Sequence, residues 1–375
     1  MNNKLKVATI FSGIGAPEQA LKRMDVDYNL IFACDNGDRL INIDYDKEFE
    51  NIKQLKTIEE KLKYVDNMYN LETRRTNFVE KSFKANYDPQ YYFQDVKLLD
   101  GGDFNNKIDL FIGGSPCQSF SIIGKKGGFK DTRGTLFYEY ARLVNEIQPK
   151  VFIYENVANV IKHDNGKTWE TMQNTFGELG YQYFYDILNA RDYGIPQSRR
   201  RLFVVGFKGK KEKINFKFPK PIHLEYKMQD FLEENCAVGS LISKNGKLVK
   251  INDNKGCPDE KYYLSPKLLK YCLSPGTKNF YHPNIEIDLP IARALLSTMG
   301  NSHRASVNNY VTTDGRIRSL TIREALRLMG FPDDYKIVVS KGQTYKQAGN
   351  SIVVDVMIAL FKQIFDIKGW KYGKN

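Results

Sequence analysis

One cysteine stands where an open α/β sheet could use it for chemistry. Cys117 follows the apolar run 108–112 and the turn 113–116. A short β-branched and aromatic run closed by two glycines is typical of a buried parallel strand that ends in a tight turn, and such sheets carry their active sites at strand ends. Pro116 fixes φ and removes one donor, so the thiol would stand on a preset loop as a nucleophile. A buried structural cysteine is the alternative, since free cysteines are often buried.

Two further strand ends carry side chains that would suit an active site. Glu155 directly follows the apolar run 151–154, which puts a carboxyl at a second strand end; an exposed Glu that opens a helix is the alternative. The turn 193–198 leads into a run of three arginines. If a strand begins there, its period of two places Arg199 and Arg201 on one face. Two guanidiniums on one face suit an anionic substrate better than solvent.

The first strands predict a nucleotide-binding edge. The strand 4–10 is followed by the glycine turn 11–16 and a helix-compatible stretch, so bare amides at a helix N-terminus leave room for a ligand. The dinucleotide fingerprint needs a third glycine where Glu18 stands, which favours a nucleoside-like cofactor over a diphosphate. The strand 29–34 ends at Asp35, whose carboxylate could accept hydrogen bonds from ribose hydroxyls or form a turn with the next two residues.

The remaining stretches supply the scaffold. Residues 38–85 are expected to form a mostly helical surface insertion whose charges make a solvated face, and we assign it no chemistry. The Gly-, Lys- and Ser-rich segment 118–134 is expected to be a mobile basic loop beside Cys117. The other expected elements are strands at 91–96, 181–188 and 202–207, and helices at 136–147, 321–329 and 352–365.

Composition excludes several classes of site. The chain has 375 residues, 42% of them hydrophobic and 27% charged, as in an ordinary soluble protein. It opens without an apolar signal-like run, and no apolar run approaches the roughly 18 residues of a membrane span, so we expect no membrane contact and a cytoplasmic location. Five widely spaced cysteines without a Cys-x-x-Cys pair, and only four histidines, support neither a disulfide framework nor a metal site.

Charge and periodicity predict two domains. The net charge of +12 favours a polyanionic partner, although a lysine-rich genome would produce the same excess. From 207 to 300 the apolar periodicity fades, and 16 Lys and Arg stand against 10 Asp and Glu. We therefore expect a catalytic and cofactor-binding domain over 1–206 and 331–375. The region 207–330 would be a basic recognition domain and hinge that grips a phosphate backbone.

Taken in order, these stretches resemble the cytosine-5 DNA methyltransferase family of the bacterial or phage restriction-modification type. The resemblance implies an α/β, Rossmann-like fold that binds S-adenosylmethionine, with helices on both faces of a mostly parallel sheet and a smaller irregular target-recognition domain. Each motif alone is weakly specific, but six in the family's order are highly specific. They are Phe11-Ser12-Gly13-Ile14-Gly15, Gly114-Ser115-Pro116-Cys117-Gln118, Glu155-Asn156-Val157, Gln197-x-Arg199-x-Arg201, Arg318-x-Leu320-Thr321-x-Arg323-Glu324 and Gly349-Asn350-Ser351.

The resemblance also implies the reaction. S-adenosylmethionine would be the cofactor, released as S-adenosylhomocysteine, and the substrate a cytosine flipped out of double-stranded DNA, with the enzyme acting as a monomer. Cys117 would add to carbon 6, because carbon 5 becomes nucleophilic only in the resulting enamine. Glu155, its pKa raised by burial, would assist at ring nitrogen 3, and Arg201 would hold the flipped nucleotide and stabilise the thiolate. The other catalytic residues implied are Gln197, Arg199 and Asn156.

The same resemblance assigns binding residues by position. The DNA contacts would come from the basic loop, and the cofactor contacts from the turns at the strand ends. The family has Glu where Asp35 stands and an aromatic where Asn36 stands, so stacking on the adenine is left open, and the compact members lack the insertion 38–85. The implied cofactor residues are Phe11, Gly13, Ile14, Gly15, Asp35, Asp95, Val96, Pro116, Leu136, Asn350 and Ser351, and the implied DNA-binding residues are Ser121, Lys125, Lys126 and Arg133.

Other functions share parts of this pattern. An RNA cytosine-5 methyltransferase would carry the same catalytic residues, and the sizeable basic region is what favours duplex DNA. A non-catalytic DNA-binding relative would have no need to retain Cys117, Glu155 and both arginines. The stretch 88–91 is loosely similar to the Asp-Pro-Pro-Tyr site of amino-directed methyltransferases, but it lacks the second proline and precedes a strand.

Overall fold

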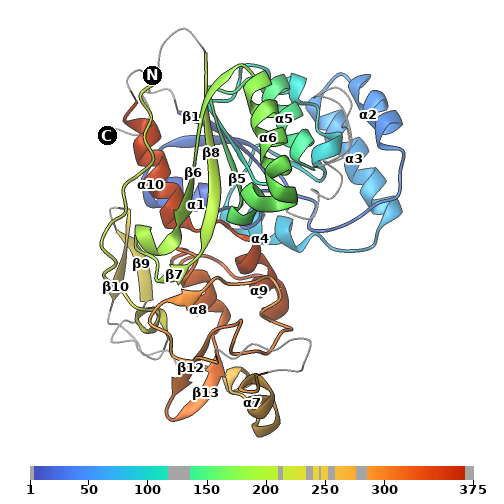
Figure 1. Ribbon diagram of the computed structural model, residues 1–375. Helices are drawn as coiled ribbons and strands as arrows, with labels where there is room; N and C mark the ends of the chain where they lie inside the picture. Colours follow the sequence, from blue (N-terminus) through green and yellow to red (C-terminus); the bar gives the residue numbers. More distant parts are fainter. Residues whose placement is uncertain are drawn as a thin grey trace.

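A seven-stranded sheet forms the upper part of the molecule in Figure 1. The computed structural model describes residues 4–116, 136–209, 214–233, 240–244, 246–251, 258–275 and 285–367. Neighbouring strands follow the order β3-β2-β1-β4-β5-β8-β6; the first five run parallel, and β8 is antiparallel to both β5 and β6. The strands span Leu5–Ile10 (β1), Tyr28–Cys34 (β2), Tyr91–Phe93 (β3), Leu110–Gly113 (β4), Val151–Val157 (β5), Tyr181–Asn189 (β6) and Arg200–Lys208 (β8). The expected α/β class with a mostly parallel sheet is confirmed.

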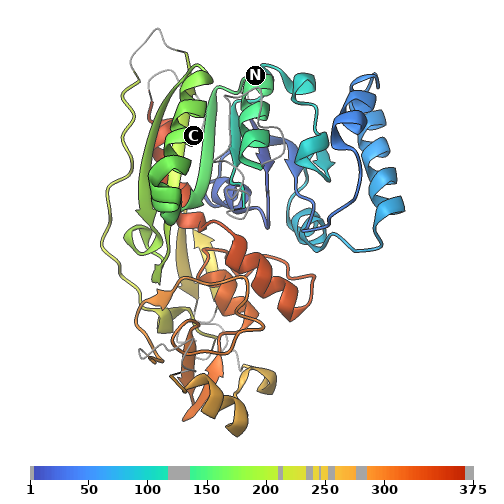
Figure 2. The same ribbon diagram turned by 45° about the vertical axis from the view of Figure 1, so that its right-hand side comes forward.

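Side chains of the central strands alternate between two hydrophobic cores. In β4, Leu110 and Ile112 pack into one core and Phe111 into the other; β5 repeats the pattern with Ile153 and Phe152. Because both faces bury apolar side chains, helices must cover both. Figures 1 and 2 show α1 (Ala16–Arg23) and α10 (Val354–Phe365) on one face, and α5 (Leu136–Ile147) and α6 (Lys167–Glu178) on the other.

Two strand ends differ from the expected ones for local reasons. The strand expected at 91–96 stops at Phe93, because the Asp95 side chain caps the 3₁₀ turn Val96–Leu98. The strand expected at 151–154 continues to Val157, because its last residues pair with β8. Glu155 therefore lies inside a strand, and the alternative of an exposed Glu at a helix start is wrong.

The insertion is helical, as expected, and lies beyond the β3 edge of the sheet (Figure 2). Its helices are α2 (Tyr45–Lys53), α3 (Ile58–Glu72) and α4 (Phe78–Asn86). Ile52 and Leu62 lie on different helices, since Thr57 and Glu60 form a capping box that starts α3. The insertion has a small core of its own, in which Ile52, Val65 and Tyr69 are buried.

The lower part of the molecule in Figure 1 consists of short elements. Two antiparallel hairpins and a two-stranded parallel pair replace the long strands of the sheet. Its strands are β7 (Gln197–Ser198), β9 (Ser240–Lys244), β10 (Lys247–Ile251), β11 (Ala292–Arg293), β12 (Tyr310–Thr313) and β13 (Arg316–Ser319), and its helices are α7 (Pro266–Cys272), α8 (Ile322–Arg327) and α9 (Lys341–Asn350). Short 3₁₀ turns elsewhere span Gly101–Phe104, Ala158–Gly166, Ala190–Tyr193, Met228–Phe231 and Glu260–Tyr262.

The C-terminal helices return the chain to the sheet. The capping box expected at Thr321 and Glu324 starts α8. The expected helix at 352–365 begins at Val354, and the motif before it ends α9. Among the described residues, the stretch Lys341–Phe365 is long enough and apolar enough to cross a membrane, judged by length and composition. Since 67% of its apolar 18-residue window is buried inside the protein, its apolar character is accounted for by packing against the core.

Candidate active site

The turn after β1 has the backbone shape of a ligand-binding turn. Phe11, Gly13 and Gly15 all have positive φ, at 51°, 55° and 79°. Gly15 is the N-cap of α1, so the helix begins directly beneath the turn. A Cβ at Gly15 would lie 2.2 Å from the Tyr87 ring, so only glycine fits there. Ile14 is buried beneath the turn and accepts a hydrogen bond from Tyr335 through its carbonyl.

Asp35 joins the end of β2 to this turn. One carboxylate oxygen accepts from the Gly13 amide at 3.0 Å, and the other from the Gly37 amide at 2.9 Å. Burial raises the pKa of Asp35, and these two amides oppose the rise. The predicted turn with Gly37 is confirmed, while a contact with ribose hydroxyls stays a prediction.

Asp95, at the end of the neighbouring strand, is held by the insertion. Its Oδ2 accepts from the hydroxyls of Tyr69 at 2.7 Å and Tyr45 at 3.3 Å, while Oδ1 accepts from the Lys97 amide at 3.0 Å. Burial raises the pKa of Asp95, and these hydrogen bonds lower it. No local sequence pattern indicated that these two tyrosines bind Asp95, because Asp95 lies 26 residues from Tyr69 and 50 residues from Tyr45 along the chain.

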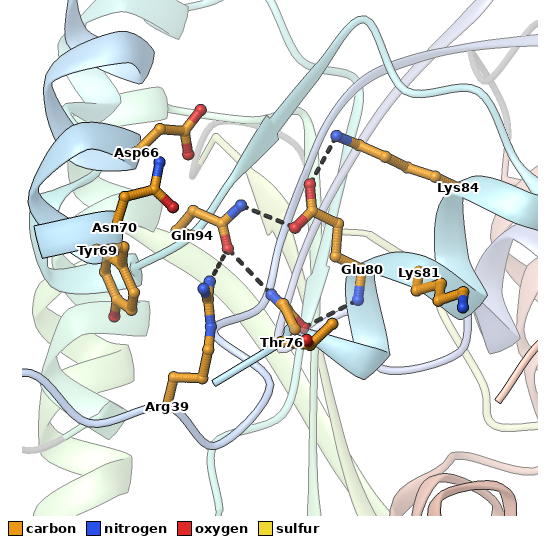
Figure 3. A pocket seen from close by; sticks show the side chains of 10 residues that line it. Arg39, Asp66, Tyr69, Asn70, Thr76, Glu80, Lys81, Lys84 and Gln94 are labelled. Atoms are coloured by element: carbon orange, nitrogen blue, oxygen red, sulfur yellow. Dashed lines mark hydrogen bonds and ion pairs between the residues drawn. The ribbon is translucent and has the colours of Figure 1, made fainter. Parts of the chain in front are cut away.

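A cavity of about 460 Å³ lies between the insertion and the sheet edge. Figure 3 shows Asp66 and Asn70 of α3 facing Glu80 and Lys84 of α4 across it, with Gln94 between them. Charged side chains of both signs line this cavity, and three of its polar side chains, Arg39, Asn77 and Gln94, are buried. The prediction that the insertion's charges form a solvated face is therefore wrong for Arg39.

The loop that leads to Cys117 is tied to β5. The Ser115 and Tyr154 hydroxyls lie 2.7 Å apart, and the Asn156 amide donates to the Ser115 carbonyl at 2.9 Å. A Cβ at Gly114 would lie 2.7 Å from the Glu155 carbonyl oxygen and 2.9 Å from its Oε2, so the loop passes directly over the carboxylate. Pro116 is the last described residue before the gap. Cys117, Ser121, Lys125, Lys126 and Arg133 lie outside the described residues, and Leu136, which opens α5, is half-buried.

Glu155 forms an ion pair at the centre of the site. Its Oε1 lies 3.2 Å from the Arg201 Nε, and the two side chains are 14% and 20% exposed. Burial raises the pKa of Glu155, and the charges of Arg201 and Arg199 oppose the rise. A carboxyl with a raised pKa beside a guanidinium can hold or share a proton, which a surface carboxylate cannot do at neutral pH.

Gln197 and Arg199 point at the protein's own backbone. The Arg199 guanidinium donates to the carbonyls of Leu295, Gly349 and Ser351, each at 2.8 Å. Burial, followed by the charge of Arg201, lowers the pKa of Arg199 to about 9. Gln197, also buried, donates to Leu328 and accepts from the Leu295 amide.

These contacts direct Arg199 at main-chain carbonyls and not at an open anionic site, although its charge still acts on Glu155. They also locate the last implied cofactor residues. Ser351 is buried under Arg199, and Asn350 is exposed at the end of α9. The structure thus brings the turn 11–15, Asp35 and Asp95 together at the ends of β1, β2 and β3, and groups Pro116, Glu155 and Arg201 at the ends of β4 and β5.

Known proteins are similar in sequence to most of the chain. The sequence profile of the family described as C-5 cytosine-specific DNA methylase matches residues 67–366. The type II methyltransferase M.HhaI of Haemophilus parahaemolyticus is 39% identical over 253 residues, covering 66% of this chain and 73% of that protein. M.NgoBI of Neisseria gonorrhoeae is 36% identical over 293 residues, covering 76% of this chain and 82% of that one.

Solved structures share the fold. The S. pombe Dnmt2 methyltransferase superposes with a TM-score of 0.65 at 16% identity, covering 97% of this chain and 99% of that one. A DNA modification methyltransferase encoded within an E. coli prophage superposes with a TM-score of 0.60 at 20% identity, covering 97% and 99%. At these identities, the solved structures show the fold alone. The family profile and the sequence relatives show that the chain belongs to the C-5 cytosine-specific DNA methylases and is a DNA cytosine-5 methyltransferase.

Proposed function

We propose that this enzyme transfers the methyl group of S-adenosylmethionine to carbon 5 of a cytosine flipped out of a specific double-stranded DNA sequence, with Cys117 as covalent nucleophile. The observation that carries the proposal is the Glu155–Arg201 pair, which is partly shielded from water directly beneath the Gly114 loop. Cys117 follows that loop by three residues, so its thiol is expected within reach of a base placed against Glu155.

The residues at the ends of β1, β2 and β3 suit S-adenosylmethionine. The turn 11–15 leaves room for close approach at a helix N-terminus, and Asp35 and Asp95 supply carboxylates for the hydroxyls and amines of an adenosine. Glu18 in place of a third glycine makes a diphosphate a poorer fit. When bound, this cofactor supplies an electrophilic methyl group.

The chain's own residues would prepare the cytosine. The Cys117 thiolate forms a bond to carbon 6 while Glu155 donates its proton to ring nitrogen 3, so that negative charge does not build up on the ring. Carbon 5 of the resulting enamine then takes the methyl group, with S-adenosylhomocysteine as the leaving group. Loss of the proton at carbon 5 to solvent restores the double bond between carbons 5 and 6 and expels the cysteine as thiolate, and ring nitrogen 3 returns its proton to Glu155. Arg201 holds Glu155 in place and favours the thiolate by its charge.

Duplex DNA with 5-fluorocytosine at the target position tests this chemistry. Fluorine cannot leave as a cation, so the enzyme should remain attached to the DNA after methyl transfer, and the adduct should survive a denaturing gel and map to Cys117 by mass spectrometry. Cys117→Ser should form no adduct, because a hydroxyl is far less ionised than a thiol. Glu155→Gln should still bind DNA but lose about 10²–10⁴-fold in rate, the usual acid–base contribution.

Two results would overturn the proposal. One is an enzyme that methylates ordinary DNA yet leaves no adduct with the fluorinated strand. The other is an adduct that maps to Cys34, Cys236, Cys257 or Cys272. Methylation of transfer RNA but not of duplex DNA would support the RNA-directed alternative.

A further inference from the structure

We infer that the 38–85 insertion is a working part of the cofactor site, and that Tyr69 is its main positioning residue, holding the Asp95 carboxylate in place for the cofactor. The inference rests on the proposed binding of S-adenosylmethionine at the ends of β1, β2 and β3. It concerns a segment that the sequence patterns left without a role.

Tyr69 contacts the segments that follow two strands of the site, Asp95 after β3 and Arg39 after β2. Its hydroxyl donates to Asp95 Oδ2 at 2.7 Å, just beyond the end of β3. Tyr69 is 1% exposed, and the Arg39 guanidinium lies 4.6 Å from its ring centroid. A hydrogen bond to an ionised group in such a buried setting is stronger than an exposed one, so it restricts the direction of the carboxylate.

A second contact holds the neighbouring strand end. The Asn77 amide, at the start of α4, donates to the Asp35 carbonyl at 2.8 Å and to Gln94 Oε1 at 3.0 Å. A Cβ at Gly37 would lie 2.2 Å from the Asn77 Oδ1, so the insertion and the turn after β2 are in close contact. The cavity wall in Figure 3 is therefore also a support for Asp35.

A third contact reaches the glycine turn. Tyr87, which ends α4, packs against Gly15 and donates to the Gln19 side chain at 2.9 Å. Earlier in the same helix, the Ser82 hydroxyl donates to Gln347 of α9 at 2.9 Å. The insertion, together with Tyr87 at the end of its last helix, thus contacts the segments that carry Gly15, Asp35 and Asp95, which follow three separate strands.

These contacts are separate from those that attach the insertion to the protein. The Lys61 ammonium forms ion pairs with Asp100 at 2.7 Å and Asp103 at 2.8 Å, and it is 7% exposed. The Tyr69 ring stays in the insertion's core whether or not it carries a hydroxyl. Removal of that hydroxyl alone should therefore loosen Asp95 without detaching the insertion.

The test compares Tyr69→Phe with Tyr64→Phe. Tyr64 lies on the same helix, and its hydroxyl donates to Glu48 at 2.6 Å, so the control removes one tyrosine–carboxylate hydrogen bond within the insertion. Calorimetry with S-adenosylhomocysteine should show a dissociation constant about tenfold higher for Tyr69→Phe, the scale of one hydrogen bond to a charged group. Tyr64→Phe should bind like wild type. In turnover, the KM for S-adenosylmethionine should rise more than kcat falls.

A double-mutant cycle tests whether Tyr69 acts through Asp95. Asp95→Asn should weaken binding by itself, and adding Tyr69→Phe to it should weaken binding little further, because the shared contact is already altered. Equal factors in both backgrounds would overturn the inference. So would a Tyr69→Phe variant that binds like wild type or that weakens binding only as far as Tyr64→Phe does.

The pH profile gives a readout that loss of stability alone would not move. Asp95 faces Tyr45 and Tyr69 from the insertion, Lys97 from its own segment, Glu139 from α5 and Cys34 from β2. The Tyr69 hydrogen bond lowers the pKa of Asp95, so its removal raises that pKa. As pH falls, Tyr69→Phe should lose affinity at a higher pH than wild type; coincident profiles would contradict the inference. If calorimetry shows that the wild-type enzyme binds no S-adenosylhomocysteine, the proposed cofactor itself would be refuted.

Discussion

Asn156→Ala should slow methyl transfer, because the Asn156 amide holds the loop that leads to Cys117. Its Nδ2 donates to the Ser115 carbonyl at 2.9 Å and to the Tyr154 hydroxyl at 2.8 Å. Asn156 and Ser115 are 2% and 4% exposed, so water has little access to replace the lost donor. Ser115 stands two residues before Cys117, and a displacement there would pass directly to the thiol.

The magnitude follows from the unpaired carbonyl. A buried acceptor without a donor costs about 1–3 kcal/mol. If that cost is relieved by loop positions in which Cys117 points away from its target, the rate of the chemical step falls by about 5- to 150-fold. Urea denaturation should show that the free energy of unfolding also falls by about 1–3 kcal/mol.

The assay is single-turnover methyl transfer at saturating DNA and S-adenosylmethionine, which isolates the chemical step from product release. Tyr154→Phe is the matched control: it removes the hydroxyl 2.7 Å from Ser115 Oγ but leaves the bond from Asn156 to the Ser115 carbonyl. Its rate should fall less than that of Asn156→Ala. An Asn156→Ala enzyme with an unchanged single-turnover rate would refute the reasoning.

Two further predictions concern buried charges. Glu18 is fully buried, and burial raises its pKa from 4.5 to about 7. Because the pKa in the folded protein lies above that in the unfolded chain, the stability that Glu18 contributes at low pH is lost as pH rises through 7. Glu18→Gln should remove about 3 kcal/mol of pH dependence between about pH 4.5 and 8 in urea titrations; an unchanged slope would argue against this. Arg318 and Glu324 form a wholly buried ion pair at 2.8 Å, so Arg318→Met should cost about 3–5 kcal/mol of unfolding free energy. If the double variant Arg318→Met/Glu324→Gln loses less unfolding free energy than Arg318→Met alone, the pairing is supported; equal losses would contradict it.

Local features of the fold could be predicted from sequence alone. The turn after β1, the capping box at Thr321 and the core stripe of α5 each depend on residues only a few positions apart. Spacing over that range reports backbone conformation and burial directly. The order of the six motifs likewise identified the family before any contact was known, and the family profile confirms it.

Tertiary structure decided which partners the polar side chains have. Arg199 was expected to face an anionic substrate, yet its guanidinium donates to carbonyls 96 to 152 residues away along the chain. Glu155 was open to a helix-start interpretation until the antiparallel pairing with β8 placed it inside a strand. The spacing of neighbouring residues predicts neither the Arg199 contacts nor the strand position of Glu155.

The insertion shows the physical reason for this division. Its sequence correctly predicts helices, because helix formation depends on the spacing and caps of neighbouring residues. Its charges were predicted to form a solvated face, and no local pattern indicated that Tyr69 and Asn77 would contact Asp95 and Asp35, because those contacts form only when the chain folds back on the sheet edge. A buried hydrogen bond takes its donor and acceptor from segments far apart in sequence, so only the packed structure can determine it.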